Sequence, residues 1–295
     1  MSLIHILILG IVQGLAELLP VSSSAHVVVV EKLLGLDPSS PPMTLLLVML
    51  HTGTMFAVIA YFWRAWRATY FRSVPAFRSF LWEVIVATIL TGVIGGGLYV
   101  GVEHTLLAGV PHAEIEDLFG HLEFIAPALA AVGVLILVAG LWERRGRHHG
   151  QVHMAPQPES TGLSAGQAGL IGAVQGLSLP FRGFSRSGAT ISTGMLLGVT
   201  KARAEIFSFA LAVVLTPPVV AREALRLWHN TAADPHALSG IAARSLFGAL
   251  VAFIAGLAAL RWLSSWLERG QWYLFGIYCL VAAAVVAALH FAWGF

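Results

Sequence analysis

Cysteine and charged residues are scarce in this 295-residue sequence. Its one cysteine excludes a disulfide framework and any cysteine-based metal cluster. Only 11% of the residues are charged and 57% are hydrophobic, whereas a soluble domain has about 25% charged residues. A soluble fold of this size leaves roughly a quarter of its surface in water, and this composition cannot cover that area with polar groups. The formal net charge of +2 is too small for a nucleic-acid-binding protein. The composition therefore predicts a multi-pass membrane protein that contacts lipid and no nucleic acid.

Six apolar segments are long enough to cross a bilayer, because a hydrocarbon core of about 30 Å needs about 20 residues per helix. They cover about 43–62, 80–101, 122–142, 205–221, 244–263 and 272–293. Their charged side chains lie near segment ends, where we expect them to reach the membrane surface. These residues are Glu83, Glu123, Glu205, Arg244 and Arg261. The first residues lack the basic segment and cleavage site of a removable signal peptide, so we expect none.

Two further apolar stretches, 2–35 and 164–199, are interrupted in the middle, at Leu19–Ser24 and at Pro180–Gly188. The interruptions are rich in proline, glycine and serine, which remove or compete for backbone hydrogen bonds. Each arm is too short to span the membrane alone, and irregular backbone at that depth is tolerated only inside protein or along a wet cavity. The pattern predicts two re-entrant helical hairpins.

The two hairpins share short sequence motifs, which indicates an internal repeat. The motif Gly-x-Val-Gln-Gly-Leu around Gln13 recurs around Gln175, 162 positions later, and the serine clusters that begin at Ser22 and Ser185 are 163 positions apart. Each half then holds one hairpin and three spans, and because three is odd the second half starts from the opposite face. We predict two inverted repeats, 1–142 and 164–295, joined by a cytoplasmic linker at 143–163 within one integral membrane domain.

The charges of the connecting segments support this topology. Arginines follow the first and third spans, whereas Glu114, Glu116 and Asp117 follow the second. Because short cytoplasmic loops are enriched in Lys and Arg, the basic segments are expected on the cytoplasmic side. Arg222 and Arg226 fit the outer side poorly. The three histidines of the linker are interpreted as part of a polar loop rather than a metal site.

Polar residues at membrane depth are costly and usually functional, and both hairpins carry them at the break. In the first hairpin, Gln13 and Glu17 are four residues apart on one helical face, and the serines that open the return helix precede His26. In the second, Arg186 stands among serines, and its guanidinium can bind two phosphate oxygens. Helix N-termini that carry serine caps also favour anions. The residues predict a phosphate pocket beside an acid–base pair, which indicates phosphoryl transfer.

Each of these residues also has a structural explanation. The serines can be helix caps, Glu17 can pair with Arg186 to stabilise the fold, and His26 can be a hydrogen-bonded helix residue. The occurrence of all of them at two matching breaks favours a site.

These motifs resemble those of the bacterial undecaprenyl-diphosphatase family, which is linked to bacitracin resistance. The resemblance is carried by Gln13–His26 and Gly183–Thr190, and extends through Phe62–Arg64 and Ser208–Ala212 over nearly the whole chain. It implies an enzyme that removes the terminal phosphate of undecaprenyl diphosphate, so that undecaprenyl phosphate is recycled for peptidoglycan synthesis. It also implies a bacterial inner-membrane location, a site facing the periplasm and a divalent cation, Mg²⁺ or Ca²⁺.

The resemblance also implies roles for individual residues. The implied catalytic residues are Glu17, His26, Ser23 and Arg186, with Glu17 also a candidate metal ligand. The implied diphosphate-binding residues are Ser22, Ser185, Ser187, Thr190 and Gln13. Whether His26 attacks phosphorus itself or activates Ser23 or water stays open.

Two departures from the family pattern affect the site. Many members carry a second glutamate where this chain has Gln13, which removes one charge, so we expect the cation to arrive with the diphosphate. The second break is one residue longer and adds Arg182. His51, which precedes Thr52-Gly53-Thr54, either lines the pocket or packs as a polar residue.

A second class of function stays open, a transporter that moves polyprenyl phosphate across the membrane. Inverted repeats with broken helices are typical of transporters. The presence of Glu17 with His26 discriminates, because a carrier needs the arginine and the helix ends but no acid–base pair. A homodimer is a further expectation.

Overall fold

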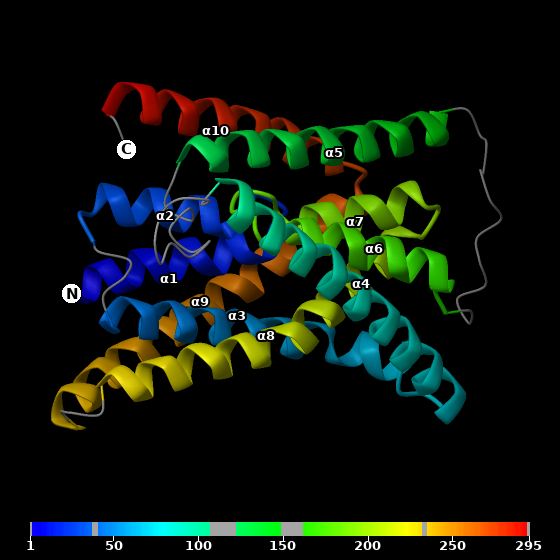
Figure 1. Ribbon diagram of the computed structural model, residues 1–295. Helices are drawn as coiled ribbons and strands as arrows, with labels where there is room; N and C mark the ends of the chain where they lie inside the picture. The colour runs from blue at the N-terminus through cyan, green and yellow to red at the C-terminus, as the bar shows by residue number, and fades with distance from the viewer. Residues whose placement is uncertain (1, 37–40, 107–121, 149–161, 232–234, 294–295) are drawn as a thin grey trace. The chain divides into compact units, whose positions relative to one another are not determined.

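A computed structural model of the protein describes residues 2–36, 41–106, 122–148, 162–231 and 235–293 (Figure 1). Within these ranges the chain forms ten α-helices and no strand. Six helices are long and apolar enough to cross a membrane, which confirms the predicted all-α, multi-pass membrane fold. The candidate spans are Met43–Thr69, Val74–Thr105, Glu123–Arg145, Lys201–Arg222, Ala242–Glu268 and Trp272–Ala292.

Several helices extend beyond the apolar segments that predicted them. α3 runs from Pro41 to Thr69 and α4 from Val74 to Leu106, so Arg64 and Arg67 lie on α3 and Arg78 lies on α4. A helix satisfies its own backbone hydrogen bonds, so it can continue past the hydrocarbon core into the polar interface. The acidic residues Glu114, Glu116 and Asp117 and most of the predicted linker lie outside the described residues.

The positions of the charged side chains agree with the prediction only in part. Glu123, Arg244 and Arg261 are exposed, and whether they reach the membrane surface stays a prediction. The expectation is wrong for Glu83 and Glu205, which are buried. Each accepts a hydrogen bond from a serine, Glu83 from the Ser79 hydroxyl at 3.0 Å and Glu205 from the Ser264 hydroxyl at 2.7 Å. A buried carboxylate needs such a donor, which proximity to a segment end does not reveal.

One compact unit of the fold contains α1 (Leu3–Leu18), α2 (Ser23–Leu33), most of α3 and the Ala212–Leu263 stretch of α8 (Lys201–Thr231) and α9 (Pro235–Glu268). Its core consists of Ile6, Leu9, Val27, Met43, Leu46, Leu50 and Ala252. α1 approaches α9 closely because it presents glycine there: a Cβ atom at Gly14 would stand 2.6 Å from the Ala252 carbonyl oxygen. This close contact fixes the helix that carries Gln13 and Glu17.

The other compact unit is drawn from Pro20–Ser22, Arg64–Leu211 and Ser264–Phe295. It holds α4, α5 (Leu122–His148), α6 (Ala165–Leu177), α7 (Arg186–Leu196) and α10 (Trp272–Trp293). α10 packs along α5 and α4 packs along α6, while α7 contacts both α5 and α6 (Figure 1). The Lys201 ammonium pairs with Glu143 and donates to the Leu267 carbonyl at 3.1 Å, which joins α8, α5 and α9.

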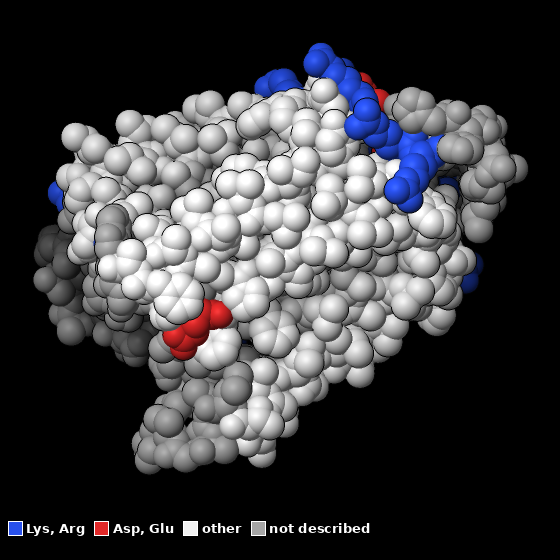
Figure 2. Space-filling model, turned by 90° about the horizontal axis from the view of Figure 1, so that it is seen from above, with Lys and Arg blue, Asp and Glu red and all other residues white. Residues whose placement is uncertain are grey.

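The described face of this second unit is suited to lipid. Figure 2 shows a broad area of uncharged residues on one face of the molecule, with most of the visible basic side chains toward one edge and an acidic patch toward the opposite edge. Large apolar side chains of α5 and α10 are exposed, among them Val134, Val138, Val281 and Val285. Arg144 and Arg145 are exposed at the end of α5, and Arg144 lies over the Tyr273 ring at 5.3 Å. An apolar band that ends in arginine and tyrosine is typical of a membrane-spanning surface.

Each interrupted apolar stretch forms a pair of short helices, α1 packed on α2 and α6 packed on α7. Ser23 and Arg186, which begin α2 and α7, are 163 positions apart, and so are Leu33 and Leu196, which end them. Three long helices follow each pair. This order fits the predicted repeat, although each compact unit takes segments from both halves. Re-entry of the hairpins into the membrane, the inversion of the repeats and the boundaries 1–142, 143–163 and 164–295 stay predictions.

Candidate active site

Glu17 lies in the last turn of α1, just before the helix ends. Ser2 caps the start of α1 by accepting a hydrogen bond from the His5 amide at 3.3 Å. Pro20 has no backbone N–H and disfavours helical geometry in the residue before it, so α1 ends at Leu18 and the chain turns. Ser23, the first residue of α2, therefore lies close to the end of α1.

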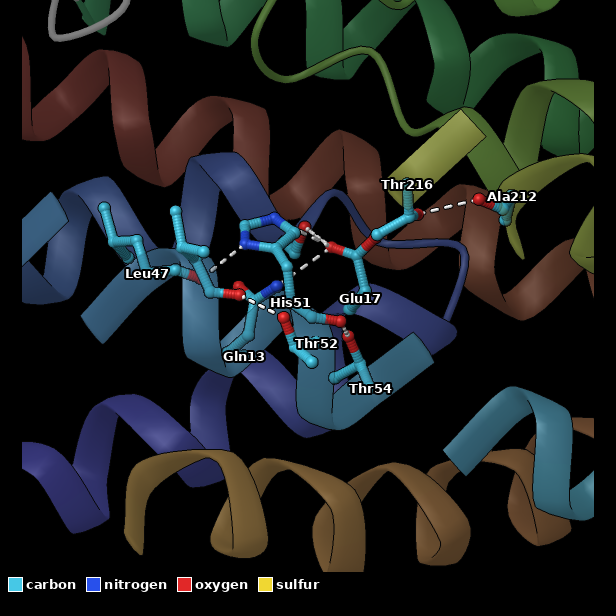
Figure 3. A network of polar contacts seen from close by, with 10 residues as sticks. Gln13, Glu17, Leu47, His51, Thr52, Thr54, Ala212 and Thr216 are labelled. Atoms are coloured by element: carbon cyan, nitrogen blue, oxygen red, sulfur yellow. Dashed lines mark hydrogen bonds and ion pairs between the residues drawn. The ribbon is translucent and has the colours of Figure 1, made fainter. Parts of the chain in front are cut away.

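Three polar side chains lie around one oxygen of the Glu17 carboxylate (Figure 3). Oε2 accepts a hydrogen bond from Gln13 Nε2 at 3.1 Å and from the Ser23 hydroxyl at 2.5 Å. His51 Nε2 stands 3.8 Å away. The Glu17 side chain is 17% exposed, so these contacts replace much of its hydration. Hydrogen bonds to a carboxylate are shorter and stronger than neutral ones, which holds the carboxylate in one orientation.

The structure places His51 beside Glu17, a position that the sequence left open. His51 Nδ1 lies 2.8 Å from the Leu47 carbonyl oxygen, one turn earlier on α3. A carbonyl oxygen only accepts, so Nδ1 carries a hydrogen in that contact. Nε2 is the nitrogen turned toward the Glu17 carboxylate (Figure 3). The neighbouring threonines are not directed at Glu17 in this way. Thr52 and Thr54 donate to carbonyls of their own helix at 2.8 and 2.9 Å.

Ser22 and His26 belong to the same break. Ser22 is buried and has a φ of 66°, a left-handed conformation that non-glycine residues rarely adopt. The carbonyl of Pro20, two residues earlier, accepts a hydrogen bond from the Cys279 thiol at 3.3 Å. His26 lies in the first turn of α2 and is half-buried. Backbone strain of this kind persists only where the surroundings enforce it, and it is common at functional sites.

The second hairpin presents the N-terminus of α7. Ser185 caps this helix, and its hydroxyl accepts a hydrogen bond from the Gly188 amide at 3.2 Å. Arg186 is the first helical residue, and Ser185 and Ser187 on either side of it are buried. Gly183 has a φ of 103° and lies against the Ile125 backbone of α5, where a side chain would collide. The turn is therefore held against α5 with an arginine at a helix N-terminus, which favours an anion.

Thr190, for which the family resemblance implied a diphosphate-binding role, lies inside the protein. It is fully buried, and its hydroxyl lies 2.8 Å from the Arg186 carbonyl oxygen and 2.6 Å from the Ser208 hydroxyl of α8. Sequence reasoning missed this role of Ser208. The signal was present, because Ser208 is a polar residue inside an apolar span.

The sequence-predicted residues thus form two groups. Gln13, Glu17 and Ser23 are brought together in the first compact unit, and Ser185, Arg186, Ser187 and Thr190 form one helix start in the second. Among the described residues, no three His, Cys, Asp or Glu side chains gather to hold a metal ion. The contacts of Glu17 given above are with an amide, a hydroxyl and an imidazole.

Known proteins resemble this chain over almost its full length. Residues 6–285 match the family model described as bacitracin resistance protein BacA. A protein of Acinetobacter baylyi named undecaprenyl-diphosphatase 2 is 52% identical over 293 residues, which is 98% of either chain. Undecaprenyl-diphosphatases of Anaeromyxobacter dehalogenans and Thermus thermophilus are 35% and 32% identical, over 98% and 95% of this chain and 92% and 95% of theirs. The multi-pass membrane protein described above therefore belongs to the bacitracin resistance protein BacA family.

Proposed function

We propose that the protein is an undecaprenyl-diphosphatase, which hydrolyses undecaprenyl diphosphate to undecaprenyl phosphate and inorganic phosphate. The observation that carries the proposal is the Glu17 carboxylate, held by Gln13 and Ser23 at a helix break. Relatives across nearly the whole chain bear this enzyme name. A transporter needs no carboxylate in contact with a hydroxyl, and none of the relatives' names cited above points to transport.

The first hairpin is suited to proton transfer. The Ser23 hydroxyl already donates to Glu17 at 2.5 Å, so the carboxylate is placed to take that proton or the proton of a water molecule. His26, in the first turn of α2, is the second proposed proton-transfer group and the alternative nucleophile. In either case water finally supplies the oxygen of the released phosphate, and the P–O bond to the bridging oxygen breaks.

The second hairpin is suited to bind phosphate. We assign the diphosphate to the α7 N-terminus, where Arg186 is flanked by Ser185 and Ser187. The guanidinium stays charged at any physiological pH and can bind two phosphate oxygens, and the helix dipole adds to the attraction. Arg186 would also stabilise the negative charge that shifts to the bridging oxygen as the bond breaks.

A divalent cation fits this donor set only if the substrate brings most of its ligands. Glu17 supplies one carboxylate, and Mg²⁺ is commonly held by one or two carboxylates together with substrate phosphates and water. We therefore propose Glu17 as the protein ligand of a substrate-borne Mg²⁺ or Ca²⁺. Such an ion would neutralise diphosphate charge. We further propose an inner-membrane location with the site open to the periplasm, and a role in recycling the carrier lipid for cell-wall synthesis.

Phosphate release by the purified protein tests the function directly. Polyprenyl diphosphates from C15 to C55 would be supplied in detergent with Mg²⁺, with Ca²⁺, or with a chelator. We expect inorganic phosphate to be released with a divalent cation and much less with the chelator. The absence of release under every divalent-ion condition would refute the enzyme. Transport of polyprenyl phosphate in proteoliposomes, unaffected by Glu17→Gln, would support a carrier.

The identity of the nucleophile needs a separate measurement. If Ser23 only orients Glu17, then Ser23→Ala leaves a reduced but measurable rate, about tenfold below the wild type. If Ser23 attacks phosphorus, the same variant loses essentially all turnover. Rapid-quench trapping of a phosphorylated protein, followed by its acid and base stability, distinguishes phosphohistidine at His26 from phosphoserine.

A further inference from the structure

Two buried hydroxyls connect α8 to the first turn of α7. Thr190 is 0% exposed and Ser208 is 1% exposed. Their oxygens are 2.6 Å apart, and Thr190 Oγ1 is also 2.8 Å from the carbonyl oxygen of Arg186. The Ser187 carbonyl lies farther away, at 3.4 Å. All these groups belong to the second compact unit.

The direction of these hydrogen bonds follows from their chemistry. A hydroxyl has one hydrogen to donate, and the Arg186 carbonyl can only accept. Thr190 therefore donates to Arg186, which leaves Ser208 as the donor in its contact with Thr190. Among the described residues, Ser208 has no other hydrogen-bond partner. The result is a directed chain from Ser208 through Thr190 to the backbone of Arg186.

We infer that Ser208 is a positioning residue for the phosphate-binding turn and that Thr190 passes on its effect without touching the substrate. This inference rests on the proposed function of Arg186. The Thr190 hydroxyl is engaged on both sides inside the protein, so it is unsuited to be the diphosphate ligand that the family resemblance implied. A displacement of about 1 Å at a binding group can reduce a rate about a hundredfold, so a tether at the backbone of Arg186 matters for turnover.

If Ser208 only helped α8 pack against α7, its loss would have a different effect. α7 also contacts α8 at Gly194, where a Cβ atom would stand 2.8 Å from that of Ala204. Loss of the Ser208 hydroxyl would then lower stability without a specific effect on phosphate chemistry. Ser192 provides the matched control, because it is a buried serine like Ser208 but lies on α7 itself. Its hydroxyl accepts a hydrogen bond from the Trp272 indole at 2.9 Å rather than joining the chain from Ser208 to Arg186.

The experiment compares five variants of the full-length protein: Ser208→Ala, Thr190→Val, the double variant, Thr190→Ser and Ser192→Ala. We expect Ser208→Ala and Thr190→Val each to lower kcat/KM about tenfold, the loss of one buried hydrogen bond, and the double variant to be no worse. Thr190→Ser, which keeps the hydroxyl, should restore activity to within about twofold of the wild type. Ser192→Ala should lower the melting temperature but keep the wild-type kcat/KM.

Two results would overturn the inference: a Ser208→Ala variant with wild-type kinetics, or a Ser192→Ala variant with the same kinetic loss as Ser208→Ala. Binding of a non-hydrolysable farnesyl methylenediphosphonate is measured in parallel. If the wild type releases no phosphate, the proposed function fails, and the inference is then decided by this binding. It stands if Ser208→Ala and Thr190→Val weaken binding while Ser192→Ala does not, and it falls if all variants bind alike.

Discussion

The two hairpins have the same framework and different chemistry. α2 and α7 are both 11 residues long and begin at positions that the predicted repeat makes equivalent. The glycines of α1 and α6 are also equivalent: Gly14 lies against the Ala252 carbonyl of α9, and Gly176 lies against the Thr91 carbonyl of α4. Close helix packing at these glycines is therefore common to both hairpins, whereas the side chains at the breaks differ.

In the proposed function, those side chains divide the work of the reaction. Glu17 of the first hairpin corresponds to Leu179 of the second, 162 positions later, and Ser23 corresponds to Arg186, 163 positions later. The first hairpin thus holds the carboxylate and the second holds the fixed positive charge. If the predicted repeat is correct, the two breaks differ in the residue types that they carry, and the proposed function uses the first as an acid–base group and the second as an anion-binding group.

The largest expected effect is at the residue that makes the first hairpin distinct. Glu17→Gln keeps the shape of the side chain but removes the charge that orients Ser23 and accepts a proton, so kcat/KM should fall about 10³-fold. Phosphate release from a polyprenyl diphosphate is the measurement. Leu179→Ala, at the equivalent position of the second hairpin, should stay within about twofold of the wild type, since surface substitutions usually have small effects. Equal losses at the two positions would contradict the division of work.

The next effect is at the residue that makes the second hairpin distinct. Arg186→Lys keeps the charge but loses the planar fork that binds two phosphate oxygens, so kcat/KM should fall about 30-fold, with Arg186→Ala lower still. The same assay measures both variants. An Arg186→Ala variant as active as the wild type would show that the α7 N-terminus does not bind the diphosphate.

A smaller effect tests the shared framework rather than the chemistry. Gly172→Ala would place a methyl group against the backbone of Ala87, and overpacking of this kind costs about 1–3 kcal/mol. The melting temperature in detergent, followed by size-exclusion chromatography, should fall. Gly92→Ala on α4 is the control, since nothing lies within 4 Å of a Cβ atom there, and it should melt at or above the wild-type temperature. Equal melting of the two variants would argue against close α4–α6 packing.

Local sequence patterns predicted much of the helical structure, because membrane-spanning helices and helix breaks depend on the residues within short stretches of sequence. The six spans, both breaks and the contact of Gln13 with Glu17 follow from hydropathy and from helical spacing. The contacts of Ser208 with Thr190 and of Ser264 with Glu205 join residues 18 and 59 positions apart, and they depend on how helices pack. Hydropathy cannot distinguish a glutamate that reaches the surface from one that is buried against a serine, which is why Glu205 was misplaced.

The smallest expected effect concerns His51, which lies 3.8 Å from Glu17 and is 45% exposed. An exposed pair of this kind is worth at most about 1 kcal/mol, so His51→Leu should lower kcat/KM by about threefold. Thr52→Val is the control, because the Thr52 hydroxyl donates to the Val48 carbonyl of its own helix rather than to Glu17, and its activity should equal that of the wild type. A loss as large as that of Glu17→Gln would instead make His51 a proton-transfer group of the first hairpin. Such a result would sharpen the contrast between the hairpins, because the acid–base chemistry would then involve α3 as well as α1 and α2.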